Sequence, residues 1–207
     1  MLEPATLVTF AGASILLALA PGPDNIFVLT QSAVRGKGAG LAVTLGLCTG
    51  LLVHTALVVF GVAALLAASA TAFRVLKMAG ALYLVYLAWG AFRAGASEVA
   101  SEDAGLSLRE YYLRGIVMNV TNPKVSIFFL AFLPQFAGPE RGSVALQIVL
   151  LAAVFILSAL VVFGLISVLA GQIGERFRRS PKAQKVLNWT AGTVFVGLAV
   201  SLLVSER

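Results

Sequence analysis

Long apolar stretches dominate the chain and determine which elements we expect. They occupy residues 5–34, 41–68, 75–92, 111–136, 144–170 and 186–204. A helix needs roughly 20 apolar residues to cross a hydrocarbon core. None of the stretches alternates between apolar and polar positions as barrel strands do, so helices remain as the way to satisfy the backbone in lipid. We therefore expect an all-α integral membrane protein with six transmembrane helices in one domain, 1–207.

Proline interrupts two of these six spans. The first is broken at Pro21-Gly22-Pro23 and the fourth at Pro123, because proline removes an amide donor and clashes with the preceding turn. Helix can restart after each break. A half-helix of 11 residues is about 16 Å long, which places Asp24 near the middle of the bilayer. Lys124 lies at a similar depth, approached from the other side.

An internal repeat relates the two halves of the chain. The matching segments are Pro23-Asp24 with Pro123-Lys124, residues 55–62 with 158–165, and Ala79-Gly80 with Ala191-Gly192. We expect repeat 1 at about 1–95, a cytoplasmic loop at about 96–110 and repeat 2 at about 111–207. Because three spans is an odd number, the second copy enters the membrane upside down. Inverted repeats are typical of secondary transporters, which bind substrate where broken helices meet.

Composition and charge narrow the class further. Apolar residues make up 59% of the chain and charged residues 12%, and the mean hydropathy is +0.97. Soluble domains carry about 25% charged residues, so a soluble enzyme, a nucleic-acid module and a disordered chain are excluded. Basic residues concentrate on cytoplasmic loops. Ten lie between spans 1–2, 3–4 and 5–6 against four on the opposite face, which predicts both termini outside the cytoplasm, with the Arg176–Lys185 cluster touching anionic lipid.

Two charged side chains within the spans are the leading site candidates. Asp24 is the one carboxylate of nine inside a span, and Lys124 is the one deep cation. A charge at the bilayer centre costs about 2.5–3.5 kcal/mol, so both should face the interior. There they bind substrate or a proton, together with Asn25 and Asn122, or they form an ion pair that only fixes the packing. In the empty carrier the pair makes contact directly or through water.

Several further side chains have two interpretations each. His54 ends a face of small residues, Ala42, Gly46 and Gly50, that permits close helix contact. His54 relays a proton together with Asp24, or it is a neutral side chain hydrogen-bonded to a carbonyl. Polar and aromatic candidates for a lining or gate are Gln31, Gln135 and Tyr83.

The motifs at the breaks resemble those of the LysE/RhtB family of amino-acid exporters. Pro21-Gly22-Pro23 followed by Gly36, Gly40 and Gly46 is similar to that family's first motif. Asn122-Pro123-Lys124 followed by Phe132-Leu133-Pro134-Gln135-Phe136 is similar to its second motif. The resemblance implies proton-driven export of amino acids through the bacterial inner membrane, with the residues of the two breaks, Pro21, Gly22, Pro23 and Pro123 included, at the site.

The leading hypothesis is therefore a secondary exporter of a neutral amino acid such as threonine, homoserine or a branched-chain residue. One intramembrane carboxylate does not easily bind the second positive charge of a lysine or arginine substrate, but a basic amino-acid exporter remains an alternative. A divalent-metal, cadmium-type exporter is another, although Asp24, His54 and Cys48 are few ligands. A single cysteine disfavours a membrane redox carrier. We expect no enzyme activity, cofactor, metal or nucleic acid; the expected partners are the amino acid, protons and lipid, with a homodimer also considered.

Overall fold

The computed structural model describes residues 2–62, 70–94, 106–178 and 180–204. The helices are α1 Pro4–Leu19, α2 Pro23–Arg35, α3 Lys37–Leu57, α5 Ala70–Arg93, α6 Leu108–Val120, α7 Pro123–Ile127, α8 Val144–Arg178 and α9 Pro181–Val204. Two π-helices, η1 Val58–Val62 and η2 Phe128–Phe132, and two 3-10 helices, η3 Leu133–Phe136 and η4 Pro139–Arg141, complete them.

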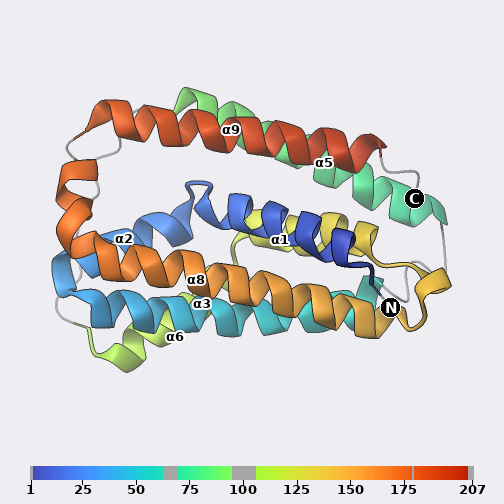
Figure 1. Ribbon diagram of the computed structural model, residues 1–207, viewed down its shortest axis with the longest axis horizontal. Coiled ribbons are helices and arrows are strands. Elements are labelled where there is room, and N and C mark those ends of the chain that lie inside the picture. Colours follow the sequence, from blue (N-terminus) through green and yellow to red (C-terminus); the bar gives the residue numbers. More distant parts are fainter. Residues whose placement is uncertain (1, 63–69, 95–105, 179, 205–207) are drawn as a thin grey trace.

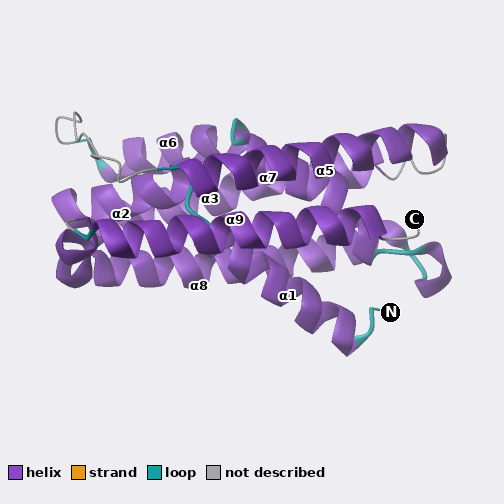
Figure 2. Cartoon of the chain, turned by 90° about the horizontal axis from the view of Figure 1, so that it is seen from above, coloured by secondary structure: helices purple, strands orange, loops and turns teal. Residues whose placement is uncertain are grey.

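The helices run roughly parallel or antiparallel to one long axis (Figures 1 and 2). The α5–α9 pair forms one layer, α3 and α8 lie on the opposite side, and the chain from α1 to α2 runs between them. The α6–η3 segment runs in the opposite direction to α1 and α2. The N-terminal end of α1 and the C-terminal end of α9 lie at the same end of the molecule, as an even number of crossings requires.

Both predicted breaks are bends at proline. Helices α1 and α2 meet at 61°, and α6 meets the following segment Pro123–Phe136 at 51°. Pro23 and Pro123 each occupy the first turn of the restarting helix, where a missing amide donor does no harm. Gly22 and Asn122 are the N-caps, and the Asn122 side chain accepts from the Lys124 amide at 3.0 Å.

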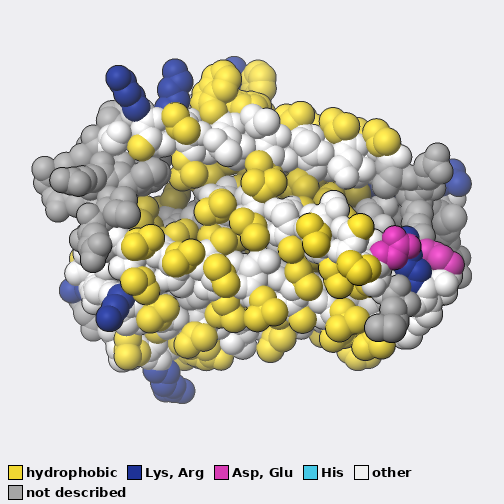
Figure 3. All heavy atoms as spheres, in the orientation of Figure 1, with side chains coloured by type: hydrophobic (Ala, Val, Ile, Leu, Met, Phe, Trp, Pro, Cys, Tyr) yellow, Lys and Arg dark blue, Asp and Glu magenta, His cyan; other side chains and the backbone are white. Residues whose placement is uncertain are grey.

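Four described helices are long and apolar enough to cross a membrane, and each bent pair, taken as one span, raises the number to six. Exposed apolar side chains such as Leu52, Leu82 and Leu157 lie on the outside of the bundle. Figure 3 shows hydrophobic side chains across the middle of one face, with charged ones mainly toward its ends. The fold is thus that of an all-α membrane protein, as the apolar pattern predicted.

The expected element boundaries needed correction at several ends. Helix α6 begins at Leu108, because Ser107 and Glu110 form a capping box there. Helix α8 extends to Arg178 and α9 begins at Pro181, so most of the basic cluster expected as a loop is helix. The end of the second span at 63–68 and the greater part of the expected loop at 96–110 lie outside the described residues.

The small face of the second span packs directly against α6. A Cβ on Gly46 would meet the Tyr112 carbonyl oxygen and lie 3.0 Å from the Gly115 Cα. A Cβ on Gly50 would lie 2.7 Å from the Asn119 Cβ. Only glycine permits this backbone approach, so the expected close contact is confirmed. It positions α6, and with it Asn119, against His54 of α3.

Candidate functional site

The first break frees backbone groups that polar side chains then satisfy. After α1 ends at Leu19, the chain bends through Pro21 and Gly22 before α2 begins. The Asn25 amide reaches back across this bend and donates to the Ala18 carbonyl. Asn25 is therefore a clamp that ties the start of α2 to the end of α1, and it is buried, 8% exposed.

The ammonium of Lys124 occupies the C-terminal end of α1. Its Nζ donates to the carbonyls of Ala20 at 3.0 Å and of Leu17 at 3.4 Å. The carbonyl end of a helix carries partial negative charge, so this is a favourable place for a cation. Lys124 is 6% exposed, and the second half of the chain thereby supplies the cap for a helix of the first half.

Gly22 makes room for this ammonium. A Cβ at position 22 would lie 3.0 Å from the Lys124 Nζ and 3.5 Å from its Cε. The backbone of Gly22 is extended, with φ −176°, a conformation that any residue adopts. The glycine is therefore required by its missing side chain and not by its backbone angles. The residue between the two prolines lets the cation of the other break approach.

A cleft of about 720 Å³ leads to the two breaks. Its floor contains Pro21–Pro23 together with Asn122, Pro123 and Lys124. Its walls come from α2, α5 and α9 and carry Ile26, Leu29, Tyr83, Tyr86, Leu87, Trp89, Gly90, Ala91, Ala94, Gln184, Leu187, Asn188 and Phe195. Ligand pockets typically measure about 300–1,000 Å³. The cleft reaches the end of the molecule where α5 ends and α9 begins.

Asp24 does not line this cleft. It lines a separate cavity of about 20 Å³ with Asn119, Lys124, Phe155 and other apolar residues of α1, α3 and α8. Such a volume holds about one water molecule. Among the described residues, Lys124 is the one that lines both spaces.

The direct ion pair that the sequence allowed between Asp24 and Lys124 is wrong for this structure. The Lys124 ammonium bonds to α1 carbonyls, and the Asp24 carboxylate lies beside the side chains of Asn122 and Asn119. The reach of the lysine past Gly22 explains the difference, since two carbonyls of a helix end offer the ammonium more than one acceptor. A contact through water fits the cavity that both side chains line.

His54 lies behind Asn119, next to the cavity. Its Nε2 is 3.1 Å from the Asn119 carbonyl oxygen, and its Nδ1 is buried without a partner in the described chain. A carbonyl only accepts, so Nε2 carries the hydrogen and Nδ1 has a free lone pair in the neutral ring. This geometry contains the carbonyl bond of the packing interpretation and leaves the Nδ1 without a partner in the described chain.

Phenylalanine side chains close the other side of the breaks. Phe128 contacts Phe10, Phe129, Phe132 and Phe155 at ring-centroid distances from 4.8 to 6.4 Å, and Phe136 packs on Phe10 at 5.1 Å. Phe128, Phe129 and Phe132 all lie in the π-helix η2, an irregular helix type often found at functional sites. We call Phe10, Phe128, Phe129, Phe132, Phe136 and Phe155 the aromatic plug.

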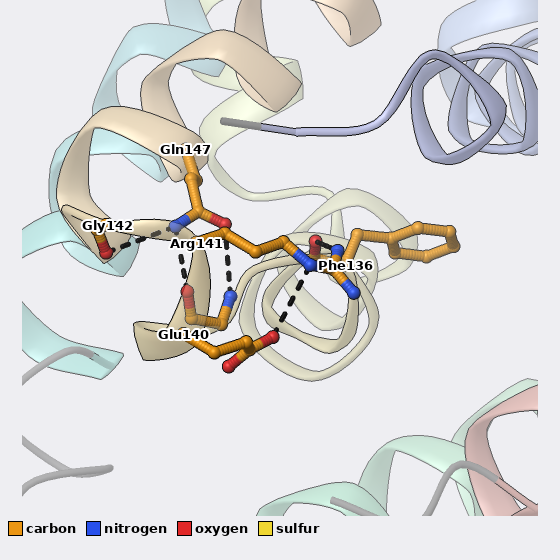
Figure 4. Close-up of polar contacts among 6 residues, drawn as sticks. Phe136, Glu140, Arg141, Gly142 and Gln147 are labelled. Atoms are coloured by element: carbon orange, nitrogen blue, oxygen red, sulfur yellow. Dashed lines mark hydrogen bonds and ion pairs between the residues drawn. The ribbon is translucent and has the colours of Figure 1, made fainter.

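Side-chain hydrogen bonds hold the loop that follows the aromatic plug (Figure 4). The Gln147 amide nitrogen donates to the carbonyls of Gly138 at 2.9 Å and Gly142 at 3.2 Å, and its oxygen accepts from the Gly138 amide at 3.1 Å. Arg141 pairs with Glu140 at 3.4 Å and donates to the Phe136 carbonyl at 3.5 Å. The loop that follows the plug is thereby tied to α8.

Some of the site residues predicted from the sequence line the cleft, and others do not. Lys124, Asn122, Tyr83 and the residues of the Pro21–Pro23 break reach the cleft, whereas Asp24 and Asn25 do not line it. Gln31 is buried in α2, and Gln135 in η3 donates to the Ala131 carbonyl at 3.2 Å, both away from the cleft lining.

Sequence reasoning missed two groups of residues. Gln184 and Asn188 of α9 line the cleft, and polar residues four apart at the start of an apolar span were a readable signal for one helix face. The aromatic plug had no such signal, since phenylalanines at these spacings resemble an ordinary helix face. In the described chain no group of three His, Cys, Asp or Glu side chains comes together.

Two broken spans that meet at a charged group on the floor of a cleft, within an all-helical membrane bundle, define the class of a membrane transporter. The chain belongs to the LysE type translocator family, whose sequence profile matches residues 15–206. A homoserine/homoserine lactone efflux protein of Salmonella typhimurium is 35% identical over 94% of this chain and 93% of its own. An uncharacterized membrane protein of Vibrio cholerae is 33% identical over 93% and 94%. No solved structure matches the chain.

Proposed function

We propose that this translocator exports a small neutral amino acid of the homoserine type across the bacterial inner membrane, driven by inward movement of protons. The observation that carries the proposal is the cleft that ends on Lys124 and Asn122 where the two breaks meet. The similarity to homoserine/homoserine lactone efflux proteins supports the substrate class. Threonine and branched-chain amino acids are of similar size and charge.

Lys124 and Asn122 receive the carboxylate of the substrate. Two hydrogens of the ammonium are used by the carbonyls of α1, which leaves one donor of three for a ligand. Asn122 lines the cleft beside Lys124 and is 4% exposed. A hydrogen bond between charged groups is stronger than one between neutral groups, so Lys124 supplies most of the affinity.

Asp24 carries the coupling proton, with His54 as the relay beside it. The carboxylate is buried with Lys124, Asn119 and Phe155 around one small cavity, and His54 bonds to the Asn119 backbone. Buried carboxylates within membranes typically serve as proton sites. The position of Lys124 between this cavity and the cleft links the proton site to the substrate site.

The cleft faces the cytoplasm in the proposed orientation. It reaches the ends of α5 and α9 that adjoin the basic segments, and the excess of basic residues on that side is typical of cytoplasmic loops. Both termini then lie outside. Helix α1 of span 1 packs on α8 of span 5, and α3 of span 2 packs on α6 of span 4. Spans 1 and 2 of the first repeat correspond to spans 4 and 5 of the second. The two contacts are therefore equivalent, as two inverted three-span repeats would give.

Uptake of labelled homoserine into inside-out membrane vesicles tests the proposal, because uptake there corresponds to export from the cell. We expect uptake that requires an imposed proton gradient, collapses with a protonophore and is absent from vesicles lacking the protein. Lysine and cadmium ions in excess should not compete. Uptake unaffected by the protonophore would overturn the proton coupling, and uptake of lysine in preference to homoserine would overturn the substrate class.

A further inference from the structure

We propose that Asn122 couples the proton site at Asp24 to the substrate site in the cleft, because its side chain borders both of them. The inference rests on the proposed function and adds to it the residue through which a proton on Asp24 changes the binding of substrate. Asn122 is a positioning residue in this step and carries no proton itself.

Asn122 occupies the second break and is held there by hydrogen bonds of its backbone and its side chain. Its backbone amide donates to the Asn119 carbonyl at 3.0 Å, and the same carbonyl oxygen lies 3.1 Å from the His54 Nε2. Its side-chain oxygen accepts from the Lys124 backbone amide at 3.0 Å and so caps α7. The residue is therefore joined to the helix that carries the cation and to the carbonyl that His54 contacts.

The side-chain amide of Asn122 is shared between the two sites. Asn122 lines the cleft and is 4% exposed, and its side chain lies beside the Asp24 carboxylate. An amide nitrogen has two hydrogens, so Asn122 can offer one to Asp24 and the other to a substrate in the cleft. Lys124 also borders both spaces, but its ammonium is held by carbonyls of α1.

A proton on Asp24 changes what the Asn122 side chain meets. An ionised carboxylate only accepts hydrogen bonds, which suits the amide nitrogen, whereas a protonated carboxyl group also donates one. The amide oxygen can accept that hydrogen and the nitrogen cannot. Since this oxygen caps α7 through the Lys124 amide, a protonated Asp24 competes with the cap for it. Substrate is then held most tightly while Asp24 is ionised, and by linkage the binding of substrate expels the proton.

The groups that surround Asp24 leave Asn122 as the residue that connects the two sites. Of the described charged and titratable side chains, Lys124 of α7 and His54 of α3 act on the carboxylate. Helix α6 contributes the neutral Asn119, and the described residues of α1 and α8 that line the small cavity are apolar. Within this described set, Asn122 is the neutral hydrogen-bonding side chain that also lines the cleft.

Proton release on binding tests the inference in purified wild-type and variant proteins. Homoserine is added in weakly buffered detergent solution while a pH-sensitive dye follows released protons, and ligand-induced thermal stabilisation measures binding. Asn122→Gly removes the amide but keeps a residue that serves well as an N-cap, as Gly22 does at the first break. Asn122→Ser is a second variant, which keeps an acceptor for the cap. Ser126→Ala is the matched control, because it removes a 3.1 Å bond to the Asn122 backbone carbonyl and leaves the side chain at 122 unchanged.

We expect the wild-type protein and Ser126→Ala to release protons when homoserine binds, and to bind it more tightly at alkaline than at acid pH. Both Asn122 variants should bind homoserine no more than about tenfold more weakly, since they lose one neutral hydrogen bond. At saturating homoserine they should lose most of the proton release, and their affinity should lose its dependence on pH. Asp24→Asn should release no protons.

The outcomes separate this inference from the proposed function. Wild-type proton release by the Asn122 variants, or release that persists in Asp24→Asn, would overturn the inference and leave homoserine export intact. Loss of release in Ser126→Ala, or loss of all binding in both Asn122 variants, would overturn it as well, because stability of α7 or substrate contact would then explain the effect. Homoserine binding without proton release by the wild-type protein would overturn the proton coupling together with the inference, and absence of homoserine binding would overturn both proposals.

Discussion

The two sides of the helix breaks differ in what faces them. On the cleft side, Lys124 and Asn122 present donors to a space of about 720 Å³. On the other side, the aromatic plug and the cavity of about 20 Å³ leave room for about one water molecule. A transporter must never open both sides at once. If the chain works as proposed, the polar groups of the cleft receive the substrate on one side, and the packed rings form the seal on the other.

Replacing Lys124 should have the largest effect, because it removes the cation of the cleft side. Lys124→Gln loses a charged hydrogen bond to substrate, worth about 1.5–3 kcal/mol, and the cap on α1. We expect homoserine uptake in inside-out vesicles to fall at least about tenfold. The matched control is Lys77→Gln on α5, which should retain most uptake. Equal loss in both variants would mean that any buried lysine matters in the same way.

Opening the closed side should cause a leak and lower stability. Phe128 is fully buried at the centre of the aromatic plug, and truncating such a ring typically lowers the free energy of unfolding by about 3–5 kcal/mol. Phe128→Ala should therefore lower the thermal midpoint and speed proton leakage through proteoliposomes. Phe60→Ala, at a ring that is 79% exposed, is the control and should do neither. Tight proteoliposomes with Phe128→Ala would show that the plug is not the seal.

Filling the space beside the lysine should weaken the cleft side without unfolding it. Gly22→Ala places a methyl group 3.0 Å from the Lys124 Nζ, which must shift by a few tenths of an ångström. We expect homoserine to bind a few-fold more weakly, with a bulkier Gly22→Val weaker still. Gly12→Ala on α1, where nothing lies within 4 Å, should bind normally. Unchanged binding by Gly22→Val would contradict the fit between position 22 and the ammonium.

The smallest effect is expected at His54, next to the proposed proton site at Asp24. In His54→Gln the new amide can still donate to the Asn119 carbonyl, so folding should persist. If His54 relays protons, uptake at neutral pH falls a few-fold while homoserine affinity stays the same, and we expect this result. Uptake with unaltered rate and pH dependence would leave His54 as a packing residue.

Much of the fold was readable from the sequence because membrane helices must be long and apolar. The prolines predicted both bends, and Gly46 and Gly50 predicted the close contact of α3 with α6. The ends of α8 and α9 were not readable, since basic residues continue a helix as well as they form a loop. The π-helix η2 has no distinctive residue pattern.

The candidate site was readable in its residues but not in their partners. Asp24 and Lys124 could be predicted because charged residues are rare inside membrane spans. The bond from Lys124 to the α1 carbonyls depends on a lysine reaching more than 100 residues back along the sequence, past the missing side chain of Gly22. Local spacing contains no information on such a contact, and the same holds for the aromatic plug, to which α1, α8, η2 and η3 contribute.

Thiol labelling from each side of the membrane tests the central claim most directly, namely that substrate reaches the breaks through the cleft while the plug closes the other side. Cys48 is buried and is replaced by alanine, and Ala91→Cys in the cleft and Phe136→Cys in the plug are compared. In the resting protein we predict that an impermeant reagent labels Ala91→Cys from the cytoplasmic face, that homoserine protects it, and that Phe136→Cys stays unlabelled. Labelling of Phe136→Cys from outside, with Ala91→Cys unreactive or unprotected, would contradict the account.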